Sequence, residues 1–293
     1  MRLTILIFLT FILKSQSAYA ANISIDRPMH CSSIDGLEFC YQNQIRIDGK
    51  IKSGDFEKFK TVLKTFSNQK GFFDQELSDD QIKDIRGRSG SQFDESYLTV
   101  KLDSVGGDVL EAMKIGHLVE QFRLETVATS CFSACFYIFV AGVRHPSYLK
   151  TKIGVHRPYF DQKYFAELGS SEAKEKHNLM VKNTKKYLRD MNVSEQLIEL
   201  VYRVSPDDMY ILTDDEIEKW VGEYHPFFED WLKSGCEHIE KPTADEEEDF
   251  SNQWTDNSFS KGYRSYLMTK IRAPFICMNE LMKTEQLKLL NKN

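Results

Sequence analysis

Ser133 and His156 are the residues whose types and spacing could carry out nucleophilic catalysis. Ser133 lies between Cys131 and Cys135 at the start of an apolar run, and His156 ends the next strand-like segment. A serine hydroxyl is a weak nucleophile at neutral pH unless a neighbouring base accepts its proton, and a neutral imidazole can act as that base. The pair therefore predicts acyl transfer, although a serine among small apolar residues is also a common core position.

A glycine pair upstream could supply a second part of such a site. Gly106 and Gly107 follow a strand-like segment and precede an amphipathic helix. A glycine N–H can approach a substrate closely, and one donor aimed at a tetrahedral oxyanion is worth about 3 kcal/mol of barrier. The N–H of Ala134, directly after the serine, would be the second donor. The sequence thus predicts an oxyanion hole from Gly107 and Ala134 beside Gly106, although a glycine pair before a helix is also a common tight turn.

Segments with strand and helix patterns alternate around these residues. Residues 44–51 alternate apolar and polar side chains, which is typical of a half-buried strand. Catalytic groups in open α/β folds gather at the carboxyl ends of such strands. Repeated strand, glycine turn and helix units predict right-handed βαβ connections and an α/β core. We expect further strands over 97–102, 124–128 and 151–156, and helices over 53–66, 108–119, 171–191, 194–201 and from Thr213, where Glu216 completes a capping box.

Other side chains compete with His156 as the base. His145 lies in a predicted turn, so we expect it to point to solvent. His117 lies on the helix after the glycine pair, where we expect it to pack in the core. A serine–lysine pair with Lys150 or Lys152 as base would also suit the fold.

The order of these motifs resembles the proteolytic subunit of Clp protease and its wider superfamily with the crotonases. In that family a strand runs into a Ser-Pro-Gly-Gly-x-Val turn, the nucleophile precedes an apolar helix ending in Ala-Gly, and the base ends a strand in His-x-Pro. In particular, the chain resembles a periplasmic branch of predicted Clp-like proteins with a Cys-x-Ser-Ala-Cys motif, over about residues 44–222. The counterparts here are Ser-Val-Gly-Gly-Asp-Val over 104–109, Cys-Phe-Ser-Ala-Cys over 131–135, Ala-Gly over 141–142 and Ile-Gly-Val-His-Arg-Pro over 153–158.

The resemblance implies a Ser-His-Asp triad on a Clp-protease/crotonase-like ββα spiral core, with no cofactor and no metal. The acid maps to residues 205–213, where Asp208 is one residue out of step with the simplest alignment and Asp207 is its neighbour. Either could orient the imidazole. Val105 stands where the family usually has proline. The resemblance also implies a peptide or protein substrate, and it leaves a homo-oligomer open.

The first residues have the pattern of a secretory signal peptide. Arg2 gives a short positive end, residues 3–13 are mostly apolar, and Ala-Tyr-Ala over 18–20 is typical of a cleavage site. No later segment has the roughly 18 uninterrupted apolar residues that a spanning helix needs. We therefore expect residues 1–20 to be removed and the protein to be periplasmic or secreted. No membrane span is expected, and no ATPase partner either, because that compartment lacks ATP.

The composition argues against a nucleic-acid partner and favours disulfide bonds as the role of the cysteines. The chain has 38 basic and 44 acidic residues, whereas a nucleic-acid-binding protein normally shows a basic excess or stripe. Six cysteines in an exported protein predict disulfides rather than metal or redox chemistry. Their order suggests that the first two pair and the last two pair, while the middle two either bridge locally or stay buried thiols. They are Cys31, Cys40, Cys131, Cys135, Cys236 and Cys277.

These observations predict one main α/β domain with additions at both ends. The expected function is an exported serine hydrolase, a Clp-like peptidase. The alternative is a catalytically silent Clp-like scaffold that binds a partner protein. An acyl-thioester enzyme of crotonase type is disfavoured, because coenzyme A is not expected outside the cytoplasm. The expected parts are a signal peptide over 1–20, an N-terminal lead-in over 21–43, a Clp-like domain over 44–222 with an exposed excursion at 67–96, and a mostly helical C-terminal extension over 223–293 with an acidic loop at 245–249.

Overall fold

The computed structural model describes most of the chain beyond the expected signal peptide, which itself lies outside the described residues. The expected excursion at 67–96 also lies outside them, apart from Ser67. Within the described part, no helix is both long and apolar enough to cross a bilayer. The described residues are 21–26, 30–34, 37–41, 44–67, 98–146, 151–252 and 258–292.

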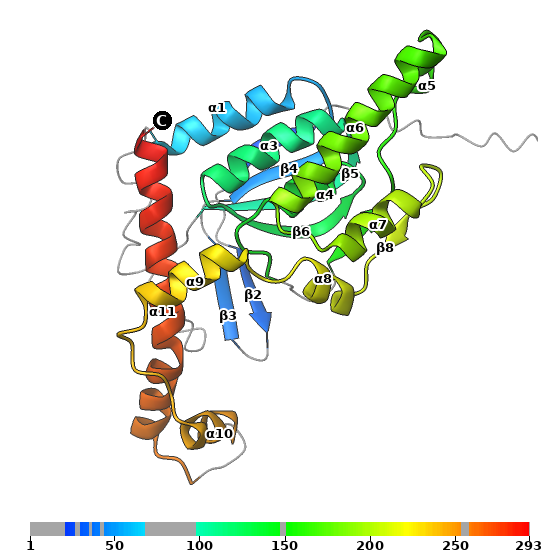
Figure 1. Cartoon of the computed structure of the whole chain (residues 1–293). Helices are drawn as coiled ribbons and strands as arrows, with labels where there is room; N and C mark the ends of the chain where they lie inside the picture. The colour runs from blue at the N-terminus through cyan, green and yellow to red at the C-terminus, as the bar shows by residue number, and fades with distance from the viewer. Residues whose placement is uncertain are drawn as a thin grey trace, which may run out of the picture.

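A six-stranded mixed sheet confirms the predicted α/β core (Figure 1). Its order is β1-β4-β5-β6-β7-β8, with the four central strands parallel and the two edge strands antiparallel to their neighbours. The N-terminal lead-in contributes the first edge strand, which sequence patterns did not reveal. The strands are β1 (Asn22–Asp26), β4 (Gln44–Ile51), β5 (Thr99–Gly107), β6 (Glu125–Phe132), β7 (Lys152–Val155) and β8 (Tyr210–Ile211).

A separate two-stranded hairpin lies between β1 and β4 in the chain. It pairs β2 (His30–Ile34) with β3 (Leu37–Tyr41) in antiparallel register. That register places Cys31 directly opposite Cys40. The side chains of this hairpin lie outside the described set, so the disulfide expected between these two cysteines stays a prediction.

Helices α1 (Asp55–Ser67) and α3 (Val109–Gln121) pack together on one face of the sheet (Figure 1). Asp108 caps α3, because its carboxylate accepts the N–H groups of Leu110 at 2.9 Å and Glu111 at 3.0 Å. The buried carboxylate of Glu111 in turn accepts the N–H groups of Gly54 and Phe56 at the start of α1. This link fixes the start of α1 against the first turn of α3, directly beside the predicted glycine turn.

A disulfide joins two parts of the C-terminal extension, and a buried amide ties the extension to the core. Cys236 and Cys277 are bridged, with Cα atoms 6.0 Å apart, which confirms the predicted pair. Gln286 is fully buried, and its amide bonds both the N–H and the carbonyl of Leu98 just before β5. The extension comprises α9 (Pro226–Gly235), α10 (Ala244–Asn252) and α11 (Lys261–Lys292).

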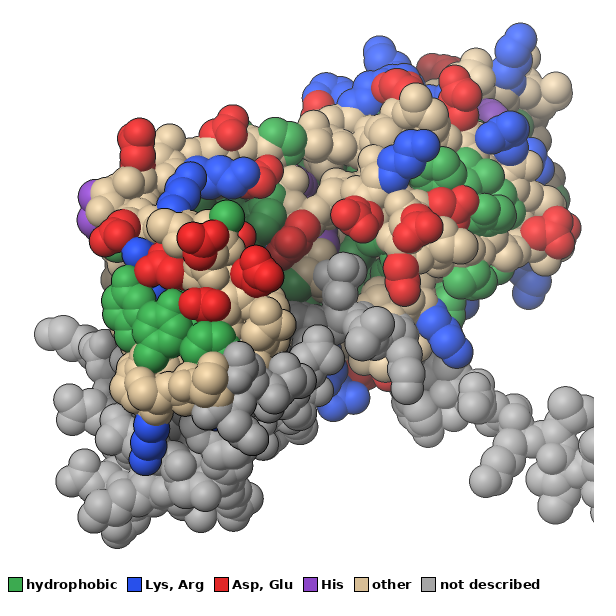
Figure 2. Space-filling view, turned by 90° about the horizontal axis from the view of Figure 1, so that it is seen from below, with side chains coloured by type: hydrophobic (Ala, Val, Ile, Leu, Met, Phe, Trp, Pro, Cys, Tyr) green, Lys and Arg blue, Asp and Glu red, His purple; other side chains and the backbone are tan. Residues whose placement is uncertain are grey.

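The acidic run at 245–249 lies in helix α10, so the prediction of a loop there is wrong. Thr243 and Glu246 form a reciprocal capping box, with backbone-to-side-chain distances of 2.8 and 3.3 Å. Acidic residues in a first turn also interact favourably with the positive end of the helix dipole. Figure 2, which views the molecule from below, shows many acidic side chains on that face, the side on which α10 lies in Figure 1.

Helices α7 and α8 begin at their predicted caps. Ser194 caps α7 (Glu195–Arg203), and Thr213 with Glu216 forms the capping box of α8 (Asp214–Trp220). These caps confirm two predictions that rest on sequence alone. The described residues form three other helices, namely α4 (Cys135–Phe139), α5 (Gln162–Ala166) and α6 (Ser170–Asp190).

The two competing histidines lie opposite to expectation. His145 is 2% exposed and His117 is exposed, so both predictions of their burial are wrong. Arg144 pairs with the fully buried Glu125 at 3.1 Å, which draws the turn inward. His145 Nδ1 then bonds the carbonyl of Gly222. Neither histidine is therefore placed to act as the base for Ser133.

His145 and His225 form a buried pair that couples folding to pH. Their ring centroids are 5.5 Å apart. Burial, reinforced by the neighbouring His225, lowers the pKa of His145 to about 3, and burial also lowers the pKa of His225. In the unfolded chain a histidine titrates near pH ~6.5. As the pH falls, the unfolded chain therefore binds protons before the folded protein does.

We expect the free energy of unfolding to fall by about 2 kcal/mol more between pH 7 and pH 5 in the native protein than in His145→Gln. The lowered pKa of His145 gives stability that is fully present above about pH 6.5 and is lost as the pH falls toward 3. Urea denaturation at both pH values measures the difference. The exposed His117→Gln variant is the matched control and should behave like the native protein. An unchanged pH dependence in His145→Gln would contradict the prediction.

Candidate active site at the strand ends

The carboxyl ends of β5, β6 and β7 meet at one edge of the sheet. Ser104 of β5 is in register with Cys131 of β6, and Phe132 of β6 is in register with Gly154 of β7. Ser133 follows β6 directly, and the histidine at position 156 follows β7 directly. The fold therefore brings both predicted residues to the same edge, beside the glycine turn that ends β5.

Ser133 has an unusual backbone conformation. Its φ angle is +55°, in the left-handed region that non-glycine residues rarely adopt. Its N–H donates to the carbonyl of Gly154 at 2.8 Å, and its carbonyl accepts the N–H of Phe136 at 3.0 Å. Because these bonds hold the turn from β6 into α4, the half-buried serine side chain is presented at the strand ends.

The two glycines allow the neighbouring strands and the serine turn to approach closely. Gly106 has φ +88°, and a Cβ there would lie 2.7 Å from Ser133 Cβ and 2.8 Å from the nitrogen of Ala134. Gly107 has φ +142°, and a Cβ there would collide with the carbonyl of Ile51 on β4. The turn predicted to form an oxyanion hole is thus in direct contact with the serine segment.

Ser104 holds this turn in place, a role that sequence reasoning missed. Its hydroxyl donates to the carbonyl of Gly49 at 2.6 Å and accepts the N–H of Gly106 at 3.1 Å. The N–H of Gly106 is therefore engaged within the protein. The N–H of Ala134 donates no hydrogen bond to any part of the chain that the structure describes. Of these two N–H groups, that of Ala134 is thus the one left open to a ligand.

The imidazole of His156 is oriented by a main-chain carbonyl. The residue is 8% exposed, and Nδ1 of its ring lies 3.0 Å from the carbonyl oxygen of Arg157. Because a carbonyl oxygen only accepts, Nδ1 carries the proton in this bond and Nε2 holds the lone pair that a general base needs. The ring of Tyr159 lies beside it, with centroids 5.8 Å apart. Side-chain patterns cannot reveal such a partner, because every residue has a carbonyl.

The structure does not join the predicted residues into a hydrogen-bonded triad. Among the described residues, no hydrogen bond connects the Ser133 hydroxyl with the His156 ring. Asp207 and Asp208 are exposed, and both donate backbone N–H groups to Ser205. Within the same residues, neither carboxylate accepts a hydrogen bond from the imidazole. The orienting role of either aspartate therefore stays a prediction.

Cys131 and Cys135 are bridged across the serine. Their Cα atoms are 5.2 Å apart and both residues are fully buried, so the alternative of two buried thiols is wrong. The described residues contain no group of three or more histidine, cysteine or carboxylate side chains arranged to hold a metal ion.

Apolar side chains surround the strand ends. Val105 in the glycine turn is 64% exposed, and Leu110 on the first turn of α3 is 59% exposed. Met209 lies over Gly154, since its sulfur would be 2.8 Å from a Cβ at that glycine. Such a rim can contact apolar groups of a ligand held at this edge.

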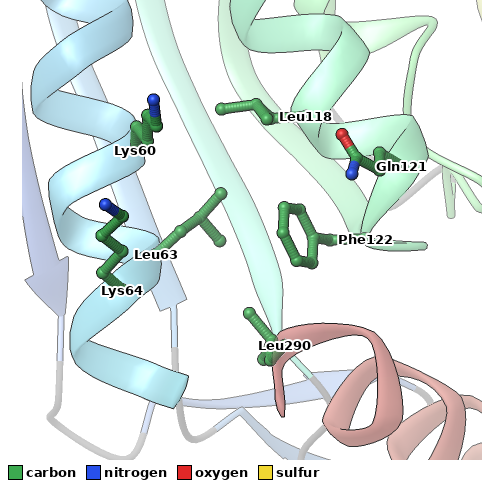
Figure 3. Close-up of a pocket in the computed structure, with 7 residues that line it drawn as sticks. All are labelled: Lys60, Leu63, Lys64, Leu118, Gln121, Phe122 and Leu290. Carbon is green, nitrogen blue, oxygen red and sulfur yellow. The ribbon is translucent and has the colours of Figure 1, made fainter. Parts of the chain in front are cut away.

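A cavity of about 290 Å³ lies elsewhere, at the far end of α3 (Figure 3). Leu63, Leu118, Phe122 and Leu290 give it apolar walls, and polar side chains from α1 and α3 complete its lining. The length of α3, about 1.5 Å per residue, separates this cavity from the glycine turn. None of its lining residues belongs to the strand-end site, so we assign the candidate chemistry to the strand ends.

Comparisons with known proteins give the fold a distant neighbour. No protein-family model and no curated protein matches this chain. A solved structure of a ClpP1 mutant from Listeria monocytogenes is similar, with 16% sequence identity and a TM-score of 0.40. The similarity covers 62% of this chain and 88% of that one. At this level the likeness carries no argument about activity, so the function rests on the site itself.

Proposed function

We propose that this protein is a serine hydrolase that cleaves peptide or related amide and ester bonds, with Ser133 as nucleophile and His156 as base. The left-handed backbone of Ser133 carries the proposal. An L-residue in this region costs about 1–2 kcal/mol, and such conformations cluster at functional sites. The carbonyl that accepts the serine N–H belongs to Gly154, two residues before the imidazole.

The arrangement supports acyl transfer in two stages. Nε2 of His156 would accept the hydroxyl proton as Ser133 Oγ attacks the substrate carbonyl, and would then donate it to the leaving group. The N–H groups of Gly107 and Ala134 would stabilise the tetrahedral oxyanion. Water, activated by the same imidazole, would release the acyl group and restore the serine.

Labelling with a fluorophosphonate probe tests the proposal. We expect the folded, oxidised protein to be labelled at Ser133, because only an activated serine attacks the phosphorus at a useful rate. The Ser133→Ala variant should not be labelled, whereas Ser130→Ala, which changes a serine on the adjoining strand, should retain labelling. Peptide mapping locates the adduct. Labelling that persists in Ser133→Ala would remove this residue from the mechanism.

A folded protein that is not labelled would favour the second candidate, a catalytically silent scaffold that binds a partner protein. One observation supports it, since no hydrogen bond in the described part of the chain links Ser133 with His156. The exposed apolar residues Val105 and Leu110 would then contact the partner.

We expect Asp207→Asn and Asp208→Asn each to lower the labelling rate by less than about 10-fold. The Arg157 carbonyl already selects the tautomer of His156, and the large effect of removing a triad acid arises when that tautomer is lost. Second-order rate constants for the fluorophosphonate measure the effect. A loss of about 10⁴-fold in either variant would establish that aspartate as the residue that orients the imidazole.

The proposal includes export to a periplasmic or extracellular compartment. Two bridged cysteine pairs support it, because disulfides form and persist in oxidising compartments. We further propose residues 44–222 as the catalytic domain and 223–293 as its extension. A peptide or protein is the proposed substrate, because the apolar rim at the strand ends suits side chains of an extended chain.

A further inference from the structure

We infer that the Cys131–Cys135 disulfide positions the nucleophile, holding Ser133 in its left-handed conformation so that the serine reacts only in the oxidised protein. The inference rests on the proposed function. It assigns to this bond a role in the reaction, beyond a contribution to stability.

The bond closes a small ring around the serine. Cys131 lies near the end of β6, Cys135 begins α4, and Ser133 is the middle one of the three residues between them. Four residue steps of extended chain span about 13 Å, whereas the two Cα atoms are 5.2 Å apart. Closing the ring therefore excludes extended conformations of the intervening residues and keeps the chain in a tight turn at the serine.

Both ends of the ring are fixed in the core. Cys131 is in register with Ser104 on β5 and Ile153 on β7, so it is held in the middle of the sheet. Cys135 is fully buried, as is the rest of α4. Because both half-cystines are anchored in the core, the tight turn that the bond closes is held at the strand ends.

The other restraints on Ser133 are modest. Its N–H and its carbonyl each make one backbone hydrogen bond, to Gly154 and Phe136 respectively. The net gain from a backbone hydrogen bond is of the same order as the cost of placing an L-residue in the left-handed region. Without the disulfide, hydrogen bonds and strain would nearly balance, and Ser133 would sample other conformations.

Loss of the conformation would also separate the serine from its oxyanion donors. The missing Cβ of Gly106 makes room for Ser133 Cβ and the nitrogen of Ala134. A change in φ at the serine would therefore move both Oγ and the N–H of Ala134 relative to the glycine turn. A misplacement of about 1 Å in a reacting group can cost on the order of 100-fold in rate.

Cysteine substitutions test the inference directly. We expect Cys131→Ala, Cys135→Ala and the double variant each to lower the second-order rate of fluorophosphonate labelling by about 100-fold. The three losses should be equal within about 2-fold, because each change breaks the same bond. The double variant Cys236→Ala with Cys277→Ala removes the distant disulfide and is the matched control, whose labelling rate should remain native. Circular dichroism confirms folding at the temperature used, and serine replacements at 131 and 135 substitute for any alanine variant that does not fold.

Amide hydrogen exchange gives a readout that does not depend on catalysis. The Ser133 N–H donates to Gly154, so we expect its exchange to become at least about 10-fold faster in the 131/135 double variant. Peptides from α10, which packs against α11 and adds no residue to the core cluster that contains the two cysteines, should exchange as in the native protein. A purely stabilising disulfide would change exchange across the sheet without selecting this amide.

The outcomes separate this inference from the proposed function. If the native protein is labelled and the 131/135 variants are labelled as fast, with unchanged Ser133 exchange, the inference is overturned and the hydrolase proposal stands. If the native protein is not labelled, the hydrolase proposal fails and the role of the bond in the reaction fails with it. A single variant that loses far more activity than the double variant would also overturn the inference, because a thiol and not the bond would then matter.

Discussion

Replacing His156 with alanine should lower the rate at which Ser133 reacts with a fluorophosphonate by about 10³-fold. General base catalysis by a positioned side chain typically contributes about 10²–10⁴-fold, and no other described histidine lies next to the serine turn. The bond from Nδ1 to the Arg157 carbonyl leaves Nε2 free to accept the proton. Second-order labelling constants near neutral pH, compared with those of the native protein, measure the loss.

The matched control is His117→Ala, which changes an exposed histidine on α3. Its labelling rate should stay within about 2-fold of the native value, because surface substitutions away from a site have small effects. Native labelling in His156→Ala, together with none in Ser133→Ala, would show that another base serves the serine. Lys152, which is exposed at the start of β7, would then be the next residue to replace.

Sequence patterns predict this fold well where local rules decide the structure. The alternation over 44–51 places Ile45, Ile47 and Ile51 in the core, as an inward-facing strand requires. The caps at Ser194 and Thr213 depend only on residues within one turn, and both are present. Both the strand and the two caps can therefore be predicted from neighbouring residues, without knowledge of distant parts of the chain.

Predictions failed where a distant partner decides burial. Nothing near His145 in the sequence shows that Glu125 draws the adjoining Arg144 inward, or that the carbonyl of Gly222 receives the ring. Strand β6 continues to Phe132, beyond the predicted end at residue 128, because pairing with β5 and β7 stabilises its polar residues in extended form. Tertiary context overrides propensity in each case.

The candidate site was predictable to the level of the sheet edge. The order of the glycine turn, Ser133 and His156 along successive strands predicts that they meet at one edge, and the register of β5, β6 and β7 places them there. The bonds that hold them were not predictable, because the carbonyls of Gly154 and Arg157 carry no side-chain signature. The types of the candidate catalytic side chains can thus be read from the sequence, whereas backbone hydrogen bonds determine how those side chains are positioned.

Replacing Gly106 with alanine should lower the free energy of unfolding by about 3 kcal/mol and slow labelling of Ser133 by about 100-fold. Two effects act together at this glycine. Its φ of +88° is costly for alanine, and the new Cβ would lie 2.5 Å from the carbonyl oxygen of Phe132 and 2.7 Å from Ser133 Cβ. Because Phe132 belongs to β6 and is backbone-paired with β7, the clash can be relieved only by moving the serine turn or the glycine turn.

Gly54→Ala separates these two effects. Gly54 has a nearly identical φ of +92°, but a Cβ there would meet nothing within 4 Å. The Gly54→Ala variant should therefore lose only the free energy that a positive φ costs alanine, about 1–2 kcal/mol. Its Ser133 should be labelled at the native rate. Urea denaturation and labelling kinetics on both variants measure the difference. If Gly106→Ala lost no more stability than Gly54→Ala and labelled as fast, the close approach of the two turns would not matter to the reaction. A selective loss in Gly106→Ala would show that contact between the glycine and serine turns is what the chemistry requires.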